Sequence, residues 1–580
     1  MNDAVSKTSK SSSEDDWQEI IIKDTSALVK LETWRDGTPE KEKNVQANLD
    51  EIQAHFRAKM DSYNEHKDEQ LKMQEFKWPI DDGDESDLPK YRVFGFRAGK
   101  GPRKVSIICH LDTVPPGNND WDPFNPRVET RVYNGVPTDF LIGRGSIDDK
   151  GPAVVAFEAF TRALGSADKE ALEKALENVT LEVLYDTSEE TDMSTPHYFD
   201  AVSGAKPAFG VVFDAYWSVR AEKGIERPTF SIYAKDGSHD GNDSQLSVTR
   251  LFTPPAPANM IPVTAEAHIA GKTELLKYFA DNVRTWYRAC QFDDSGYHPA
   301  DISVTNSGSE VVITAKVAGA QHGSAPDQNR ANGANPVVSL TNFLASLVDR
   351  NLLANNHNGK MCRFIRWAFG TRVFGENQPD LLQRFDTVFK EGNGTTYALT
   401  QLIPADDKGQ AMITLGLDIR YAIGHHGIGW DGKEGKLTGE SLFKSIFEQL
   451  IDRYHAEAGG QKLMFQTETV FGPDIRSLRD DNLFRINTAY RAVMGNNCPM
   501  QATGGATDAH GYLELVTAGA LFTTSFGPPV NYHGIDEGAP LIDLENSGKI
   551  LLELLQKELC VQTSQAKHYA AIHHAHGCCN

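Results

Sequence analysis

The sequence predicts an α/β protein in which a domain with a mostly parallel central sheet is interrupted by an inserted α+β domain. Strand-like segments alternate with helix-like segments before residue 225 and again after residue 436, and this alternation is typical of parallel sheets. The residues between them combine half-exposed strand patterns with an amphipathic helix. A chain of 580 residues is also too long for a single hydrophobic core.

The predicted organisation has five segments along the chain. They are a disordered, Ser-rich N-terminus (1–15), the first part of the α/β domain (16–225), the inserted domain (226–435), the second part of the α/β domain (436–562) and an irregular tail rich in His and Cys (563–580). Inserting one domain within another is the simplest arrangement that lets the α/β pattern resume after residue 436.

In the first part of the α/β domain, helical patterns come first, and strands alternate with a helix after them. Residues 17–76 have a mostly helical pattern with charged faces. The predicted strands are 91–98, 104–110, 179–190 together with its closing loop, and 207–217. Residues 151–164 form a predicted helix with Pro152 in its first turn, where the missing N–H group costs nothing.

The inserted domain has a different pattern, with predicted strands at 228–235 and 309–320 and a predicted helix at 272–290. One face of this helix carries Leu276, Phe279, Val283, Tyr287 and Cys290. This spacing is that of an amphipathic helix packed on a sheet. After the inserted domain, residues 544–559 form the last predicted helix.

Composition and charge exclude several classes of partner. The net charge of −22 argues against nucleic acid and anionic membranes and favours cationic ligands, including metal ions. No apolar run is long enough to span a bilayer, and the N-terminus lacks the apolar region of a secretory signal. Seven scattered cysteines indicate reduced thiols rather than a disulfide framework, so we expect a cytoplasmic protein.

Acidic and imidazole side chains follow three predicted strands at the points where the strands end, and two further carboxylates precede the helix at 151–164. Because ligands of parallel sheets bind beside the carboxyl ends of the strands, we expect these groups to converge. Carboxylates packed together repel one another unless a positive charge lies among them. A set of imidazole and carboxylate ligands suits Zn²⁺, with Mn²⁺ or Co²⁺ as alternatives. The residues of this set are His110, Asp112, Asp148, Asp149, Asp186, Glu189, Glu190 and Asp214.

Six motifs give the chain a resemblance to a known family. They are "HLDTVPPG", "GRGSIDDKG", "TSEETD", "FDAYW" with "EKGI" after it, "HGSAP", and a late "HG" that follows Tyr532. On these motifs the chain resembles the dinuclear zinc peptidases that include carnosinase, aminoacylase and bacterial dipeptidase V. It is most similar to the dipeptidase V branch, since "AEKGI" leads into a long inserted domain. The resemblance implies a phosphorylase/hydrolase-like catalytic domain with the inserted domain as a lid.

The resemblance also implies two bound zinc ions, with manganese or cobalt as alternatives. In the family pattern, His110 and Asp214 bind one ion, Glu190 and His533 bind the other, and Asp148 bridges both. A competing candidate for the last histidine is the one in "DAHGY", His510. The histidine of "YHGIDEG" is preferred because the acidic "IDEG" follows it, as in the family.

The remaining roles implied by the resemblance concern catalysis and substrate binding. Asp112 orients the ring of His110, Glu189 is the general base, and His322 of "HGSAP" stabilises the oxyanion. Arg420 of "LDIRY" holds the substrate carboxylate through its bidentate fork. The loop "TGGATDAHG" contributes to substrate binding through Gly505, Thr507 and Asp508.

These roles predict metal-dependent hydrolysis of dipeptides or short peptides with a free C-terminal carboxylate, through a metal-bridging water and a glutamate base. One alternative is deacylation of N-acyl amino acids, which uses the same chemistry. Another is a catalytically inactive metal-binding relative, against which the presence of Glu189 argues. The inserted domain is long enough to bring His322 to its own chain's site, so we expect a monomer, with a homodimer as the alternative.

Overall fold

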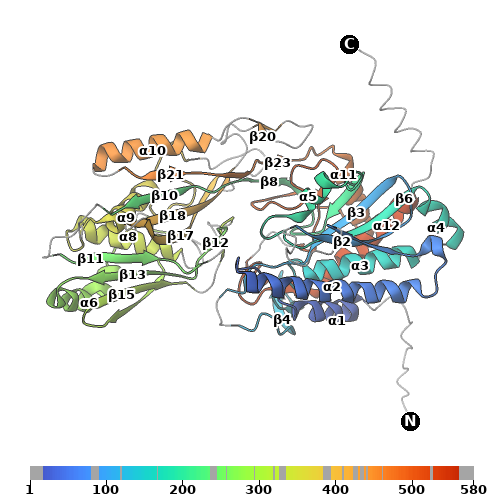
Figure 1. The fold of residues 1–580 in the computed structure, drawn as a ribbon, viewed down its shortest axis with the longest axis horizontal. Helices are drawn as coiled ribbons and strands as arrows, with labels where there is room; N and C mark the ends of the chain where they lie inside the picture. The colour runs from blue at the N-terminus through green and yellow to red at the C-terminus, as the bar shows by residue number, and fades with distance from the viewer. Residues whose placement is uncertain are drawn as a thin grey trace, which may run out of the picture.

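A computed structural model gives the fold of residues 17–560 (Figure 1). The parts of this range that it leaves undescribed are 80–90, 118–120, 166–167, 235–244, 256–257, 293, 318–320, 325–334, 383–393, 408–409, 422–428, 431–436, 439–441, 460–461 and 523–526. The predicted N-terminal segment and the predicted tail therefore lie outside the described residues. Figure 1 shows two bodies side by side, the inserted domain on the left and the α/β domain on the right.

The α/β domain is built on a six-stranded sheet of order β1-β2-β6-β3-β7-β25. Its strands are β1 (Gln74–Trp78), β2 (Val93–Ala98), β6 (Val179–Asp186), β3 (Arg103–His110), β7 (Phe209–Val212) and β25 (Leu515–Thr517). The four strands from β6 to β25 run parallel to one another, while β1 and β2 are antiparallel at one edge. The predicted α/β class with a mostly parallel sheet is confirmed.

Side chains of the central strands alternate between the two faces of this sheet, as the two-residue period of a strand requires. Ile107 and Val183 enter the larger core, whereas Ile108 and Leu184 enter a smaller core on the other face. Because both faces are covered, the strands are almost continuously apolar.

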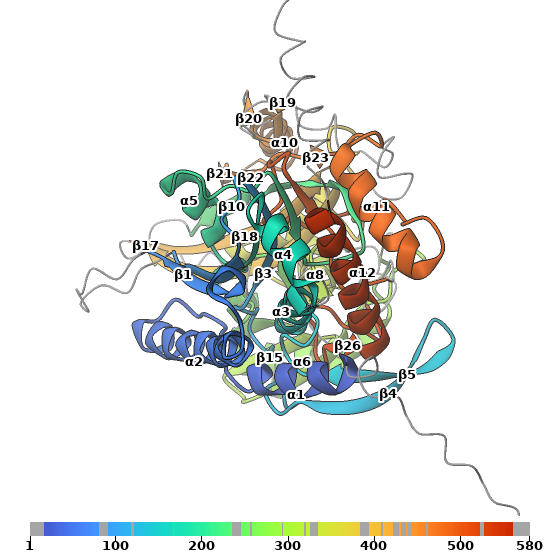
Figure 2. The ribbon, with the colours of Figure 1, turned by 90° about the vertical axis from the view of Figure 1, so that its right-hand side faces the viewer.

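Helices of the α/β domain cover the larger core. Figure 2 shows α3 and α12 side by side, with α1 and α2 near them. The helices of this domain are α1 (Trp17–Val29), α2 (Pro39–Asn64), α3 (Lys150–Gly165), α4 (Lys169–Leu176), α5 (Ser194–Ala201), α11 (Asp481–Met494) and α12 (Leu541–Cys560), with a short 3-10 helix at Glu69–Leu71. Within the described part of the chain, no helix is both long and apolar enough to cross a membrane.

Two small sheets complete the α/β domain. One has the order β26-β5-β4 and the other β23-β8-β24. Their strands are β4 (Arg127–Tyr133), β5 (Val136–Ile142), β8 (Val219–Glu222), β23 (Asp474–Ile475), β24 (Gln501–Thr503) and β26 (Gly538–Pro540).

The inserted domain contains two antiparallel sheets with helices between and over them. The first has the order β11-β13-β15-β14, and the second has the order β21-β10-β18-β9-β22 with β17 also paired to β18. The strands are β9 (Gly224–Glu226), β10 (Thr229–Tyr233), β11 (Ser247–Phe252), β13 (Thr264–Ala270), β14 (Asp301–Asn306), β15 (Glu310–Lys316), β17 (Thr396–Asp407), β18 (Gln410–Tyr421), β21 (Met464–Gln466) and β22 (Thr469–Phe471).

The helices of the inserted domain are α6 (Thr273–Arg288), α8 (Pro336–Asp349), α9 (His357–Ala368) and α10 (Leu442–Ala458). Leu276, Phe279, Val283 and Tyr287 are the buried residues of α6, so the helix uses the face that its sequence pattern predicts. Short strand pairs join β12 (Met260–Ile261) to β16 (Gln321–His322) and β19 (Gly429–Trp430) to β20 (Leu437–Thr438).

The core of the inserted domain continues past residue 435, where the sequence pattern places its end. Phe443, Phe447 and Leu450 of α10 and Leu463 belong to this core, and β21 pairs with β10. The helix–strand pattern of residues 442–466 looks the same in either domain, because hydrophobic periodicity identifies an element but not the sheet it joins.

Candidate metal centre and substrate cleft

The parallel strands β6, β3 and β7 are neighbours in the sheet and bring the predicted site residues to one edge. His110, the last residue of β3, lies directly opposite Asp186, the last residue of β6. Glu189 and Glu190 follow β6, and Asp214 follows β7. The loop that contains Asp148 leads into α3 above the same edge.

A carboxylate–imidazole cluster forms there from His110, Asp148, Glu190, Asp214 and His533. His110 Nε2 lies 2.9 Å from Asp148 Oδ1, and His533 Nε2 lies 3.2 Å from Glu190 Oε1 and also contacts Asp148 Oδ2. One potential ligand atom each from His110, Asp148 and Glu190 lie within 4.8 Å of one another. Asp214 is held at the cluster by Tyr532, whose hydroxyl donates a hydrogen bond of 2.6 Å to its Oδ1.

Burial and charge shift the pKa values of this cluster strongly. Burial raises the pKa of Glu190 to about 7, although the imidazole of His533 opposes the rise. Burial would also raise the pKa of Asp148, but the charges of His533 and His110 hold it well below its usual range. Carboxylates outnumber imidazoles here, so the cluster has an excess of negative charge that divalent cations neutralise.

The donor set therefore fits metal ions. Imidazole nitrogens and carboxylate oxygens from strand ends and neighbouring loops meet in one small space, where every group except the half-buried Glu190 is buried. Such a mixed set is typical of zinc sites.

Asp112 contacts His110 and the loop that carries the two glutamates. The N–H groups of Glu189 and Glu190 donate to its two carboxylate oxygens, at 3.0 and 3.2 Å. His110 Nδ1 lies 3.1 Å from the backbone oxygen of Asp112 and 3.5 Å from its carboxylate. Arg35 adds a contact of 3.4 Å to Asp112 Oδ2. Asp112 thus fixes both the His110 ring and the loop of the two glutamates.

A buried ion pair holds the loop of His533 against the loop of Asp148. Arg144 pairs with Glu537, and both side chains are almost fully buried. Arg144 also donates to the backbone oxygens of His533 and Gly534, each at 3.1 Å. The sequence motif "GRGSIDDKG" contains Arg144, but nothing in the sequence alone shows what it binds nearly 400 positions away.

We expect Arg144→Ala to lower the free energy of unfolding by about 3–5 kcal/mol, since it leaves the charge of Glu537 buried without its partner. Chemical denaturation of the metal-free protein measures the change. Arg127→Ala is the matched control, because Arg127 forms an exposed pair of 2.9 Å with Asp536 on the same loop and should cost about 1 kcal/mol or less. Equal losses in the two variants would contradict the role given to Arg144.

A cleft of about 420 Å³ joins this cluster to the inserted domain. Glu189, Glu190, Asp214 and His533 lie along one part of its wall, and Arg420 of β18 and Asn259 lie along another. Arg420 is buried, with Nε 2.7 Å from Asp418 Oδ2 and Nη1 donating to the Gly504 oxygen at 3.0 Å.

Gly505 and Thr507 of the late Gly-rich loop line the cleft, whereas Asp508 is buried and accepts a hydrogen bond of 3.2 Å from Thr195. His510 belongs to the same loop, but its ring binds elsewhere, with Nδ1 2.7 Å from Glu222 Oε2 and Nε2 2.6 Å from the Gly472 oxygen. Of the two candidates for the last histidine, His533 is therefore the one placed in the cluster.

The backbone of His322 lies in β16, opposite Met260; the side chain of His322 lies outside the description. The next two residues approach the cleft of the same chain. A Cβ atom at Gly323 would lie 2.9 Å from Asp418 Oδ2, and one at Gly504 would lie 3.0 Å from the side chain of Ser324. The "HGSAP" segment thus runs close to the Arg420 side of the cleft.

Comparison with known proteins decides the family. The sequence model described as Peptidase family M20/M25/M40 matches residues 107–557. The chain belongs to this peptidase family. A protein of Staphylococcus saprophyticus named "Putative dipeptidase" is 28% identical over 479 residues, 80% of this chain and 85% of that protein. One of the same name from Staphylococcus haemolyticus is 26% identical over 474 residues, again 80% and 85% of the two chains.

The fold of this M20 peptidase is also similar to that in the crystal structure of human carnosine dipeptidase 1. The alignment covers 94% of this chain and 97% of that one, with a TM-score of 0.50 and 14% identity. The resemblance to the dinuclear zinc peptidases is confirmed, and the chain is a metallopeptidase.

Two residues at the site of this M20 peptidase, Tyr532 and Arg144, were missed as contributors from sequence alone. Asp149, one of the two carboxylates expected before the helix at 151–164, accepts the N–H of His110 at 3.0 Å. Both missed residues stand inside or next to the quoted motifs, which was the available signal. Their partners are distant in sequence, so the roles become visible only in the fold.

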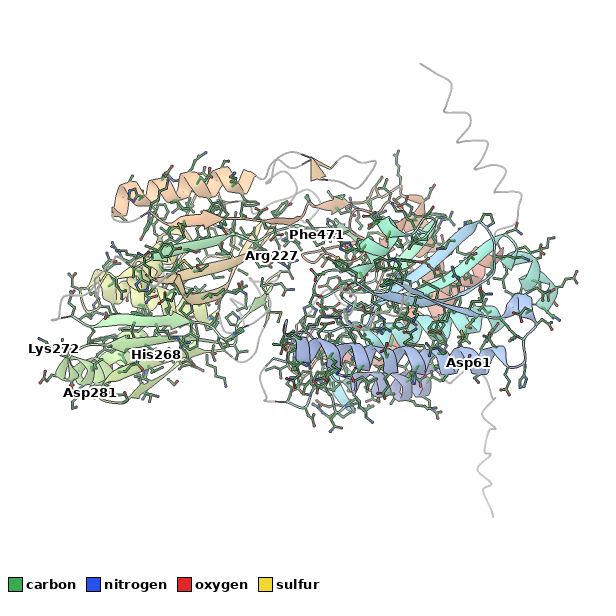
Figure 3. The ribbon with its side chains drawn as sticks, viewed as in Figure 1. Asp61, Arg227, His268, Lys272, Asp281 and Phe471 are labelled. Atoms are coloured by element: carbon green, nitrogen blue, oxygen red, sulfur yellow. The ribbon has the colours of Figure 1, made fainter. Side chains whose placement is uncertain are left out.

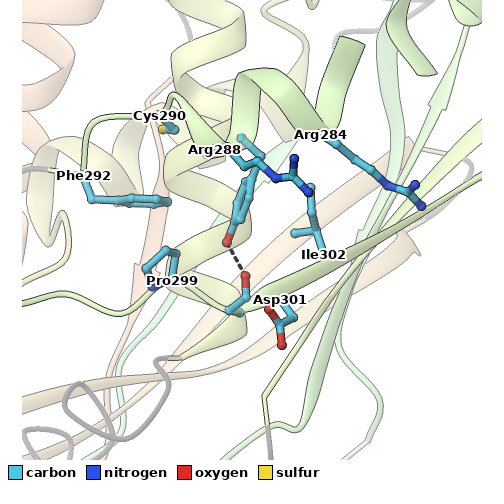
Figure 4. A pocket seen from close by; sticks show the side chains of 9 residues that line it. Arg284, Arg288, Cys290, Phe292, Pro299, Asp301 and Ile302 are labelled. Atoms are coloured by element: carbon cyan, nitrogen blue, oxygen red, sulfur yellow. Dashed lines mark hydrogen bonds between the residues drawn. The ribbon is translucent and has the colours of Figure 1, made fainter. Parts of the chain in front are cut away.

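A separate hollow of about 270 Å³ lies in the inserted domain of this M20 peptidase, between α6 and β14 (Figure 4). Tyr287 donates a hydrogen bond of 2.6 Å to the Ala300 oxygen there, and the exposed Arg284 and Arg288 lie at the rim. Asp301 is the one acidic residue in its described lining. This hollow therefore lacks the ligand set for a metal-dependent reaction.

Proposed function

We propose that the chain is a metal-dependent dipeptidase that hydrolyses dipeptides or short peptides with a free C-terminal carboxylate. The observation that carries the proposal is the cleft itself, which has the carboxylate–imidazole cluster on one side and the Arg420 guanidinium on the other. Its volume of about 420 Å³ suits a small ligand.

We assign the residues that would hold two metal ions, with zinc as the first choice and manganese or cobalt as alternatives. His110 and Asp214 would hold one ion, Glu190 and His533 the other, and Asp148 both. Support comes from the short contacts among His110, Asp148, Glu190 and His533. Metal ions bound there would lower the pKa of a water molecule, so that hydroxide is available near neutral pH.

Glu189 is the proposed general base. It lines the cleft beside the cluster, and its backbone is fixed by Asp112. Burial raises the pKa of Glu189 well above its usual range; His110 opposes this rise, while Asp214 and Glu190 add to it. In the reaction, Glu189 takes a proton from water as the water oxygen bonds to the carbonyl carbon. The same proton then goes to the leaving amine as the C–N bond breaks.

Arg420 is the proposed carboxylate-binding residue, and His322 is the proposed oxyanion-stabilising residue. Support for the first is the position of Arg420 in the cleft wall, and support for the second is the approach of Gly323 and Ser324 to the same wall. Because Arg420 and the cluster line the same small cleft, a free carboxylate close to the scissile bond favours dipeptides over long peptides.

Deacylation of N-acyl amino acids needs the same groups, so the test is a substrate panel. The enzyme, loaded in turn with zinc, manganese or cobalt, is assayed on free dipeptides, on N-acetyl amino acids and on tripeptides. Highest kcat/KM on dipeptides supports the proposal, whereas highest kcat/KM on N-acetyl amino acids would make the chain a deacylase. No hydrolysis with any of the three metals would favour an inactive relative.

We further propose that His322 acts in the same chain, so that a monomer is active. We expect a mixture of inactive His322→Ala chains and inactive Glu189→Ala chains to stay inactive, since each cleft keeps one defect. The measurement is dipeptide hydrolysis before and after prolonged mixing at high concentration. Recovered activity would show that His322 is supplied across a subunit boundary.

A further inference from the structure

Arg227 is a second guanidinium in the cleft, and the proposed function does not use it. It lies just after β9, at the junction between the two domains, where Figure 3 labels it close to Phe471. Both residues line the cleft. The Nε atom of Arg227 is buried and has no hydrogen-bond partner among the described residues. Burying such a group without a partner is costly.

The strand register places Arg227 on the same face as Arg420. Ile419 pairs with Glu226 and Gly416 pairs with Thr229, so Arg227 falls opposite Asp418 in the same register. Arg420 lies opposite Ile225, two positions before Arg227. Diagonal neighbours of this kind are about 7–8 Å apart. Both guanidinium groups therefore face the same part of the cleft.

The charges of Arg227, Arg420 and Asp418 add up to an excess of one positive charge in this part of the cleft. Asp418 is bound to Arg420 by the contact of 2.7 Å, and these two groups neutralise each other. Arg227 forms no ion pair within the described chain. Glu468 also lines the cleft, but its side chain is exposed, so water screens its charge. One substrate carboxylate would balance this excess.

Arg420 already uses part of its donor capacity within the protein. Its bonds to Asp418 and to the Gly504 oxygen occupy two of the five guanidinium N–H groups. A single carboxylate offers room for several donors, since its two oxygens have about four lone-pair positions. A second arginine can thus share the same anion.

We propose that Arg227 and Arg420 together bind the C-terminal carboxylate of the substrate. The inference rests on the proposed dipeptidase function and adds a binding residue to it. Arg227 supplies the uncompensated charge, and Arg420, held by Asp418 and Gly504, supplies a rigidly placed second group. The clamp selects substrates with a free carboxylate against those with an amide.

The test compares Ala-Leu with Ala-Leu amide for the wild type, Arg227→Gln, Arg227→Lys and the control Arg250→Gln, an exposed residue of β11. We expect Arg227→Gln to lower the acid-to-amide ratio of kcat/KM by about 10- to 100-fold, mainly through KM. Arg227→Lys should keep part of the preference for the acid over the amide, since lysine keeps the positive charge. Arg250→Gln should match the wild type. Melting temperatures within a few degrees of the wild-type value show that the variants are folded.

A wild-type acid-to-amide ratio in Arg227→Gln would overturn the inference. The inference would also be wrong if Arg227→Gln lowered kcat/KM for Ala-Glu but not for Ala-Gln. Arg227 would then recognise an acidic side chain of the substrate. Calorimetric titration measures binding without turnover. Ala-Leu and Ala-Leu amide are each titrated into Glu189→Gln and into the double variant Glu189→Gln/Arg227→Gln. If the wild type hydrolyses no dipeptide but Arg227→Gln still weakens binding of the acid alone, the proposed function fails and the carboxylate clamp stands.

Discussion

Glu189→Gln is expected to lower kcat for dipeptide hydrolysis by about 10²- to 10⁴-fold while the protein keeps its metal. The amide has nearly the size of the carboxylate but cannot accept the proton of the attacking water. Because Glu189 is half-buried beside the carboxylates of Glu190 and Asp214, a neutral side chain should not lower the melting temperature. The measurements are steady-state kinetics, metal content by inductively coupled plasma analysis and thermal unfolding.

Glu190→Gln is the informative comparison for this result, because Glu190 contacts His533 within the carboxylate–imidazole cluster. It should lower metal content and lose activity for that reason. Asp200→Asn, at the exposed end of α5, is the neutral control. If Glu189→Gln loses metal and Glu190→Gln keeps it, the two roles are the reverse of those proposed.

Asp148→Ala is expected to remove the bound metal and reduce activity below detection. Asp148 is the one residue of the cluster that contacts both histidines, through Oδ1 to His110 and Oδ2 to His533. Its removal takes a ligand from both proposed ions and leaves the two imidazoles without the carboxylate that faces them. The measurement is metal content per chain together with dipeptide hydrolysis.

The controls for Asp148→Ala separate metal loss from misfolding. Asp139→Asn, at an exposed position of β5, should behave as the wild type. Wild type stripped with a chelator should be inactive and recover when zinc is added back, whereas Asp148→Ala should not recover. Two metal ions retained by Asp148→Ala would contradict the bridging assignment.

Several features of the site follow from local sequence patterns. Buried parallel strands are continuously apolar, so β3, β6 and β7 are recognisable, and the polar residues that stop them mark the sheet edge. His110, Glu190 and Asp214 are predictable in this way as neighbours. The pairing of His110 with Asp186, at the ends of β3 and β6, agrees with this prediction. The proposed metal-ligand roles, including that of the late His533, came from motif resemblance instead.

Other features depend on pairs that are distant along the chain and carry no local signal. The ion pair of Arg144 with Glu537 is one, and the placement of α10 in the inserted domain is another. The antiparallel edge strands β1 and β2 are a third. Strand pairing and domain membership depend on which surfaces meet, and hydrophobic periodicity is the same for either choice.

The sequence by itself therefore determined the α/β class, the strand ends that carry the cluster and the chemistry of the side chains there, because these depend on residue type and short-range period. Only the tertiary structure decided which side chains support the cluster and that Arg227 shares a face with Arg420; it also places His533, the histidine that the motif resemblance favours, at the cluster. The physical reason is that a site is made where segments hundreds of residues apart pack together. Their register is set by the burial of whole sheets rather than by any one segment.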